Sequence, residues 1–554
     1  MLEGFDPNMI QDIEGARKAI VHLLNIIEEL QQSMAALREE NQRLRDEINR
    51  LKGEQGRPKI KPNKEGAQEA GSRNYSSEQE RHKSKEHKRS SKRDRIEVNE
   101  TKPLSVDRKL LPPDAEFKGY EDVVVQDIQI HTHNILFRKE KYYSASEEKT
   151  YLAEMPAGYE GEFGPGVKAW AVTLYYSCNM SEPKILEAFQ NAGLIISEGQ
   201  VSNFLVKNQE VFHQEKDAVY DAGLRSSPWQ QIDETGTRQD GDNKHCHIVC
   251  NPLFTAYFTT SDKSRLSVLD VLTNFRERVY LLNAEAFGYL ETFGLSAAVI
   301  EGLKGLPQEE SLPEKTFLDV LAAKLPALGP NQRSRVLEAA AVAAYHAQTE
   351  FPVIRLLLCD DAKQFRVLTE ELGLCWVHDG RHYKKMSPFV AHHRQLLETF
   401  RKQYWDYYER LLEYKEHPTE QEATTLEEDF DALFSTATGF NALDERIAKT
   451  KANKSSLLMV LRHPEIPLHN NPAELGARQL VRKRDVSFGT RTEDGRKAWD
   501  TFLTLAATAK KLGINFFRYV YDRVSGAYQM PHMAEVIAQR AQELRLGTSW
   551  AHGP

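Results

Sequence analysis

A heptad repeat of apolar residues between residues 13 and 51 constrains the fold of this chain more than any other feature. The side chains at the a and d positions, spaced alternately by three and four residues, are Ile13, Ala16, Ile20, Leu23, Ile27, Leu30, Met34, Leu37, Asn41, Leu44, Ile48 and Leu51. Isoleucine at most a positions and leucine at most d positions favour a parallel two-stranded coiled coil, in which the polar Asn41 would fix the register. We predict a dimerisation helix over residues 8–52, with contacts at Leu30, Leu37, Asn41, Leu44 and Leu51. The alternative is a single amphipathic helix packed on its own chain.

The length and composition predict a folded protein of several domains. The 554 residues are 40% hydrophobic and 28% charged, and the net charge of -8 excludes a generally basic nucleic-acid coat. Any nucleic-acid-binding surface must therefore be local. Five cysteines in so long a chain exclude a disulfide scaffold and fit a reducing cytoplasm. No run of about 18 apolar residues and no basic, apolar leader occurs, so we expect neither a membrane span nor a secretory signal.

Residues 53–104 are predicted to be a flexible linker. This stretch has almost no large apolar residues and is rich in Lys, Glu, Ser and Gly, so it cannot bury enough surface to fold alone. Within residues 81–95, eight Lys and Arg residues stand against two acids. The basic stretch is either a solvated linker or a mobile arm on DNA phosphates, and the two interpretations are compatible.

Residues 105–225 are predicted to form a small DNA-binding domain. The β-branched and aromatic stretch 123–145 suits strands or a short hairpin. Pro183 can begin a helix, Gly193 interrupts it and Ser197 can begin a second helix, which together match a helix-turn-helix over 183–207. The second helix carries polar side chains of the kind that contact base edges: Gln200, Ser202, Asn203 and Lys207. The alternative is an ordinary helical hairpin.

Residues 226–520 show the alternation of strands and helices expected of an α/β core of the ribonuclease-H-like type. The predicted elements are three antiparallel strands at 229–233, 244–250 and 255–261, a helix at 266–272, a strand at 351–359, a helix, a strand at 372–378, and a late helix from 471. The continuous apolar run 351–359 suits a strand buried on both faces. Helical insertions are expected near 283–350 and 388–460, and a helical tail over 521–554.

Three carboxylates, Asp233, Asp360 and Glu474, are candidates for phosphodiester chemistry. Two Mg²⁺ ions that activate an attacking oxygen and stabilise a leaving oxygen need several oxygen ligands that converge. Spacing alone is not specific, because 81 acidic residues always supply some such set. Glu474 also lies where it could cap a helix that begins at Asn471. Arg478, one helical turn further on, is either solvated or placed to hold a phosphate.

Four blocks, IDETG, LLLCDDAKQF, LCWVH and NNPAELGARQLVRKRDVSFGTRTEDGRKA, resemble the bacterial insertion-sequence sixty-six family of DDE transposases. The order of the blocks, the N-terminal heptads and the helix-turn-helix also fit, so the similarity spans nearly the whole chain. The resemblance implies that Asp233, Asp360 and Glu474 are the catalytic metal ligands of two Mg²⁺ ions, for which Mn²⁺ could substitute. It implies DNA (element ends and target) as the partner, a homodimer or higher homo-oligomer, helper proteins as possible further partners, and a nucleoid-associated bacterial protein in the cytoplasm.

The chain departs from the family pattern in three places. No cysteine precedes Cys178, so the zinc-binding segment that usually follows the heptads is missing or replaced. The interval between Asp233 and Asp360 is longer than the family pattern, and the excess is Ala- and Leu-rich. Leu475 stands where an arginine usually follows the glutamate. These departures put ancillary functions in doubt more than the three carboxylates.

Two other clusters have metal-ligand types. His245, Cys246, His247 and Cys250 lie on a predicted strand, where they would face opposite sides and could not converge, so we interpret them as strand residues. Cys375 and His378 form a Cys-x-x-His element, with His382 as a possible third ligand. Because a structural zinc site normally needs four ligands, we interpret this pair as packing beside the active site, with an accessory role possible.

The helical stretches around Glu474 suggest how DNA could be held. Nine Lys and Arg residues face four acids between 478 and 511, and the expected DNA contacts are Arg478, Arg482, Lys483, Arg484 and Arg491. Trp405 and Tyr408 in the second insertion are core residues or, alternatively, platforms for a flipped base. The sequence thus predicts a DNA transposase that cleaves strands and transfers a 3′-hydroxyl. The rival hypotheses are a non-catalytic or domesticated DNA-binding protein and a nuclease that never joins strands.

Overall fold

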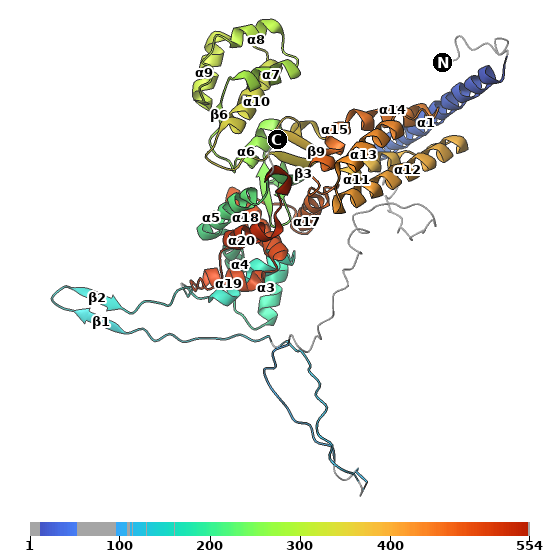
Figure 1. Ribbon diagram of the computed structural model, residues 1–554. Coiled ribbons are helices and arrows are strands. Elements are labelled where there is room, and N and C mark those ends of the chain that lie inside the picture. The colour runs from blue at the N-terminus through green and yellow to red at the C-terminus, as the bar shows by residue number, and fades with distance from the viewer. Residues whose placement is uncertain are drawn as a thin grey trace.

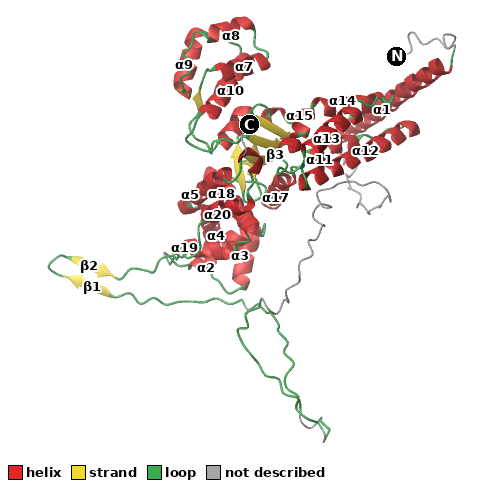
Figure 2. Cartoon of the chain, viewed as in Figure 1, coloured by secondary structure: helices red, strands yellow, loops and turns green. Residues whose placement is uncertain are grey.

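The computed structural model describes residues 12–51, 96–107, 111–112, 115–128, 130–159 and 161–551. The basic stretch 81–95 and most of the expected linker lie outside these residues. The body is mainly helical around a single five-stranded sheet, and a long extended segment leads to a small hairpin (Figures 1 and 2). None of the helices within the described ranges has the length and apolar character needed to cross a membrane.

The N-terminal heptads form one continuous helix, α1 (Ile13–Leu51), as the sequence predicts. One face of its first half packs on the second helical insertion, where Asn25 and Glu28 are buried (Figure 1). The Glu28 carboxylate accepts backbone N–H groups of Phe389 (2.8 Å) and Val390 (2.9 Å), directly before α12 (Ala391–Glu416). The heptad seam is a different face and is exposed, with Leu30 at 49%, Leu37 at 63% and Leu44 at 50%. The helix therefore packs on its own chain and also presents an open apolar seam, and the coiled coil stays a prediction.

The second half of the region expected to bind DNA, from residue 165, is helical. Its helices are α2 (Pro165–Val172), α3 (Glu182–Asn191), α4 (Glu198–Val206) and α5 (Glu210–Arg225), with a π-helical turn, η5 (Thr173–Ser177), after α2. The two expected helix starts are confirmed, because Pro183 lies in the first turn of α3 and the Ser197 hydroxyl caps α4 by accepting the N–H of Gln200. The expectation of strands over 123–145 is mostly wrong. Only β1 (Lys141–Ser144) pairs, with β2 (Lys149–Leu152), whereas residues 123–128 and 130–140 are extended without a strand partner.

The central sheet has the strand order β5-β4-β3-β8-β9. Its strands are β3 (Trp229–Gln239), β4 (Asp242–Cys250), β5 (Thr255–Thr260), β8 (Leu356–Cys359) and β9 (Glu371–Leu374). The first three are antiparallel neighbours, as predicted, and β8 and β9 join β3 in parallel. All four residues of β8 are buried, which explains the continuous apolar run.

The end of the sheet differs from the expectation at residues 372–378. β9 stops at Leu374, and α11 (Trp376–Lys385) begins immediately, because the Cys375 sulfur accepts the N–H of His378 and caps the helix. The helix expected between the two parallel strands is only a short 3₁₀ turn, η6 (Lys363–Phe365). The chain therefore turns from strand to helix directly beside the carboxyl end of β8.

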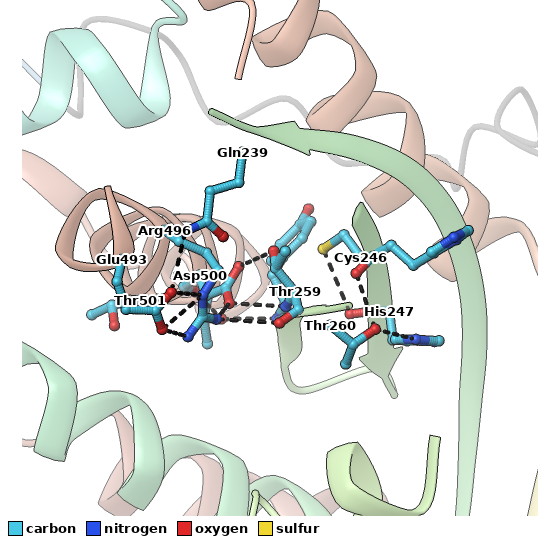
Figure 3. Close-up of polar contacts among 12 residues, drawn as sticks. Gln239, Cys246, His247, Thr259, Thr260, Glu493, Arg496, Asp500 and Thr501 are labelled. Carbon is cyan, nitrogen blue, oxygen red and sulfur yellow. Dashed lines mark hydrogen bonds and ion pairs between the residues drawn. The ribbon is translucent and has the colours of Figure 1, made fainter. Parts of the chain in front are cut away.

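Helix α18 (Glu493–Leu512) covers the edge strand β5. Every fourth residue of this helix satisfies a backbone N–H of β5: Thr508 accepts from Thr255 (3.2 Å), Thr504 from Tyr257 (3.0 Å) and Asp500 from Thr259 (2.9 Å). Figure 3 shows the last of these contacts together with Arg496, which bonds both Asp500 and the Thr259 carbonyl. Because the free edge of a sheet is otherwise open to another strand, these side chains close it and fix α18 in register with the sheet.

Two helical insertions flank the sheet, as predicted. The first contains β6 (Val279–Tyr280), α7 (Ala284–Thr292), α8 (Ala297–Leu303), β7 (Leu312–Pro313), α9 (Glu314–Lys324) and α10 (Pro330–Ala347). The second contains α12, α13 (Glu420–Leu433), α14 (Asn441–Ala452), α15 (Lys454–Leu457) and α16 (Met459–Arg462). Trp405 and Tyr408 are 8% and 0% exposed in the core of the second insertion, so the alternative of a base-stacking platform at these residues is wrong.

The C-terminal residues form three helices and not one long tail. They are α19 (Phe516–Val524), α20 (Met533–Leu544) and α21 (Thr548–Ala551). α19 packs on α2 and α20 on α5. The fully buried Arg523 bonds the equally buried Glu215 of α5 at 3.4 Å, which ties this end of the chain to the helical region before the sheet.

Candidate active site

Asp233 and Asp360 lie where the parallel pairing of β3 with β8 ends, while β3 itself continues to Gln239 against β4 and does not stop at Asp233 as expected. β3 and β8 pair in register from Trp229 opposite Leu356 to Gln231 opposite Leu358. Extending this register by two residues places Asp233 beside Asp360, which directly follows β8. The carboxyl ends of parallel strands are where functional side chains of open α/β sheets commonly gather.

Glu474 reaches the same place from α17 (Asn471–Ser487). The residues before this helix are tied to β3 by two amide side chains: Asn470 donates to the Ile232 carbonyl (2.6 Å), and Gln231 donates to the His469 carbonyl (2.9 Å). Burial raises the pKa of Asp233 to about 6, and the negative charges of Asp360 and Glu474 add to this rise. Asp360 and Glu474 therefore both lie near enough to Asp233 to repel its negative charge.

The Glu474 carboxylate is held by basic side chains. Arg381 of α11 donates to both of its oxygens, at 2.8 and 2.9 Å, and His378 and Arg478 lie at 3.6 and 3.4 Å. Although burial opposes ionisation, hydrogen bonds from His378 and Arg381 lower the pKa of Glu474 to about 2. The capping interpretation is wrong, because the N-cap of α17 is Asn470 and the Glu474 side chain is turned to Arg381.

Cys375 and His378 lie beside Glu474. The Cys375 sulfur is buried and accepts the N–H groups of His378 (3.4 Å) and Asn470 (3.2 Å), so it joins the start of α11 to the start of α17. Potential ligand atoms of Cys375, His378 and Glu474 lie within 4.8 Å of one another. Across the described ranges this is the one group of three such residues close enough to share an ion, and neither His382 nor Asp233 and Asp360 belong to it.

The other cysteine and histidine cluster, at residues 245–250, consists of strand residues, as interpreted from the sequence. Cys246, His247 and Cys250 are fully buried in β4, and His247 bonds the Thr260 hydroxyl at 3.1 Å. His245 instead pairs with Glu234 of β3 at 2.6 Å. Their side chains have different partners and do not converge.

Comparison with known proteins shows which family the chain resembles. Residues 341–498 match the family model described as Transposase IS66 family, and this range includes Asp360, Arg381 and Glu474. The chain belongs to the IS66 family of transposases. It is also 34% identical over 321 residues to an uncharacterized protein, y4jO, of Sinorhizobium fredii, an alignment that covers 58% of this chain and 99% of that protein.

The side chains expected to contact DNA in this IS66-family chain lie on two surfaces. On α4, Gln200, Ser202 and Asn203 are half-buried, and Lys207 directly after the helix is exposed. On and after α17, Arg478, Arg482 and Arg491 are exposed, whereas Arg484 is half-buried and donates to the Gly236 carbonyl.

Lys483 does not face solvent, so its prediction as a DNA contact is wrong. Its side chain is fully buried, and its ammonium group donates to the Tyr175 carbonyl at 2.6 Å and lies 3.1 Å from the centre of the Tyr175 ring. Burial lowers the pKa of Lys483 to about 7. This residue joins α17 to η5 and is not available to a phosphate.

Arg381 was not identified from the sequence as a residue of the site. The feature that could have identified it is its position one helical turn after His378, on the same face of a short helix. Its partner, Glu474, is distant in the sequence, and only the packing of α11 against the start of α17 brings the two together.

Proposed function

We propose that this IS66-family protein is a DNA transposase that cleaves strands at the ends of a mobile element and joins the freed 3′-hydroxyl to target DNA. Asp233, Asp360 and Glu474 are the proposed catalytic carboxylates. The observation that carries the proposal is that two parallel strands and a helix bring these carboxylates to one place, where burial and then the charges of Asp360 and Glu474 raise the pKa of Asp233. The sheet order, with three antiparallel strands followed by parallel ones, supports a ribonuclease-H-like core.

The types of the donor atoms suit two Mg²⁺ ions, because carboxylate oxygens are the ligands that Mg²⁺ prefers. The three carboxylates lie at one end of the parallel strand pair but are not close enough to share one ion, so binding would have to draw them together. Such ions, when bound, activate the attacking oxygen and stabilise the leaving oxygen, and Mn²⁺ could replace them.

The neighbouring residues orient the carboxylates. One oxygen of Asp233 accepts the backbone N–H of Glu234 (2.8 Å), and one oxygen of Asp360 accepts that of Ala362 (3.2 Å). Arg381 keeps Glu474 ionised and fixes its rotamer. Arg478 is half exposed on the same helix and is placed to bind a phosphate next to the carboxylates.

The test uses a supercoiled plasmid that carries the native flanks of the gene, incubated with the protein and Mg²⁺, with the 3′ ends of the products mapped. Wild type is expected to nick at defined positions, and Asp233→Asn is expected to bind the flanks without nicking them. Asp361→Asn is the matched control, since this exposed neighbour of Asp360 pairs with Arg366 and Asn453. Normal cleavage by Asp233→Asn would exclude the proposed site.

A second candidate is a non-catalytic or domesticated DNA-binding protein. The observation that favours it is the ion pair in which Arg381 occupies both oxygens of Glu474, so the carboxylate must exchange partners before it can bind a metal. Footprinted flanks without any nick would support this candidate. Defined nicks without joined products would instead support a nuclease that does not transfer strands.

The proposal assigns DNA and a second copy of the chain to separate surfaces. The polar side chains of α4, as the second helix of a helix-turn-helix, would contact the element ends. The exposed seam of α1 would form a parallel coiled coil with the partner protomer.

A further inference from the structure

Phe488 is an aromatic residue that the fold itself does not need. Its side chain is 84% exposed, more than any other aromatic residue that the structure describes. Its backbone is left-handed, with φ 61° and ψ 12°, at the C-cap of α17. A left-handed backbone costs about 1 kcal/mol for a residue with a side chain. A solvated ring at a strained position adds little to stability, which is a reason to seek a ligand for it.

The loop that carries Phe488 is held firmly on the β3–β4 hairpin. Thr490 donates to the Arg238 carbonyl (3.1 Å), and Asp240 donates to the Thr490 carbonyl (2.8 Å). Gly489, at φ +103°, approaches so closely that a Cβ there would lie 2.4 Å from the Arg238 oxygen. The ring is therefore presented by a fixed backbone.

Helix α18 supports the same loop from the other side. Gln239 at the end of β3 donates to Glu493 (3.2 Å), and Arg496 binds Glu493 and Asp500 at the start of α18 (Figure 3). A rigid aromatic side chain loses little entropy when it binds a planar ligand.

Two exposed arginines, Arg482 and Arg491, lie on either side of Phe488 in the chain and offer contacts for phosphates. Acidic side chains are also exposed around the loop, at Asp240 and Asp242 of the hairpin and at Asp485, which lies 4.0 Å from the half-buried Arg484. The phosphate contacts available beside the ring are therefore the two exposed arginines.

Helix α17 connects Phe488 to the candidate active site. Glu474 lies in its first turn and Phe488 at its C-cap, which separates them by roughly 21 Å at 1.5 Å per residue. Arg478 and Arg482 follow Glu474 at intervals of four residues, and both are exposed. DNA with a phosphate at Glu474 and its backbone along these arginines would reach Phe488 after about six base steps.

We propose that Phe488 stacks on an unpaired or unstacked nucleobase of DNA bound along α17. The ligand class is a nucleobase and not a particular sequence, because every base offers a π-face to an aromatic ring. The inference rests on the proposed function in one respect, namely that DNA runs past Glu474. It gives the chain a base contact that the buried Trp405 and Tyr408 do not provide.

The test measures binding of full-length protein, without divalent metal, to a labelled oligothymidine of about 20 nucleotides and to the same strand in a duplex. Phe488→Asn suits the left-handed backbone and is expected to weaken single-strand binding about tenfold, with little effect on the duplex. Phe275→Asn is the matched control: Phe275 is also left-handed, at φ 55°, but its ring lies against Phe258. It is expected to bind as wild type does.

A tryptophan at position 488 would report stacking on a nucleobase directly, through its fluorescence. Phe488→Trp should bind like wild type and show fluorescence quenching, relative to wild type, when the oligothymidine is added. Unchanged single-strand binding by Phe488→Asn, equal losses in both asparagine variants, or no oligothymidine binding by wild type would each overturn the inference. So would a change in the oligomeric state of Phe488→Asn, which would assign the ring to a contact between protomers.

The base contact at Phe488 and the proposed transposase function can be rejected independently, because the binding measurement needs neither metal nor cleavage. Weaker single-strand binding by Phe488→Asn, together with no plasmid nicking by wild type, would support the base contact and reject the proposed catalytic function. Nicking that depends on Asp233, together with unchanged binding by Phe488→Asn, would do the reverse.

Discussion

Buried charged residues on α17 serve two different purposes at the residue scale. Glu474 is 8% exposed and stays ionised, because Arg381 donates two hydrogen bonds to it. Lys483 is fully buried, its ammonium group contacts two backbone carbonyls and the Tyr175 ring, and the charge of Glu182 offsets only part of the effect of burial on its pKa. The first residue keeps a charge that the proposed chemistry needs, whereas the second is a structural lysine whose charge opposes folding.

This burial of Lys483 predicts a pH dependence of stability. Its pKa is about 7 in the folded protein, against an ordinary value of 10.5 for a solvated lysine, so the unfolded chain binds more protons between these values. The free energy of unfolding should therefore rise with pH from about 7 to about 10. Lys483→Met should lack this rise, which denaturant unfolding of both proteins at several pH values can measure. Parallel pH profiles for the two proteins would contradict the assignment.

At the element scale, α1 shows that one helix can use two faces. Asn25 and Glu28 dock it on the second insertion, while the a and d residues stay in solvent. The periodicity of the sequence predicts the helix and its seam, since a 3.5-residue repeat is a local property. The docking face could not be predicted, because Asn25 and Glu28 are polar and find their partners more than 300 residues away.

The exposed seam predicts a dimer that depends on α1. Leu37→Lys combined with Leu44→Lys should convert the protein from dimer to monomer, because two charges would be buried at d positions of a coiled coil. Both leucines are exposed within one protomer, so the fold of each protomer should survive. Glu39→Lys, at the outer f position, is the control and should remain dimeric. Sedimentation equilibrium distinguishes the species, and a monomeric wild type would reject the seam as an interface.

At the scale of the whole molecule, the pattern of strands and the order of the three candidate carboxylates along the chain were predictable. Which face of each helix is buried was not predictable. The sequence predicts the strand that carries Asp233, although β3 does not end there as expected but continues to Gln239, and the apolar run before Asp360 indicates a buried strand. The burial of Lys483, Trp405 and Tyr408 depends on which distant element covers each helix, and composition does not contain that information. The strand expected at 372–378 ended early because the Cys375 sulfur caps a helix there, which is a side-chain contact that propensity does not describe.

The contact between α1 and the second insertion links the proposed dimerisation helix to the helices beside the candidate active site. Glu28 holds the N–H groups that begin α12, and α12 packs on α11, which carries His378 and Arg381. Glu28→Ala would leave these part-buried N–H groups without their carboxylate acceptor, at a cost of about 1 kcal/mol, and release α1 from the core. We expect this variant to remain dimeric and to nick single ends, but to lose joined products that need two ends at once. A plasmid with two ends, analysed beside Glu39→Lys, measures both products. Unchanged two-end joining would show that α1 pairs the protomers without orienting their active sites.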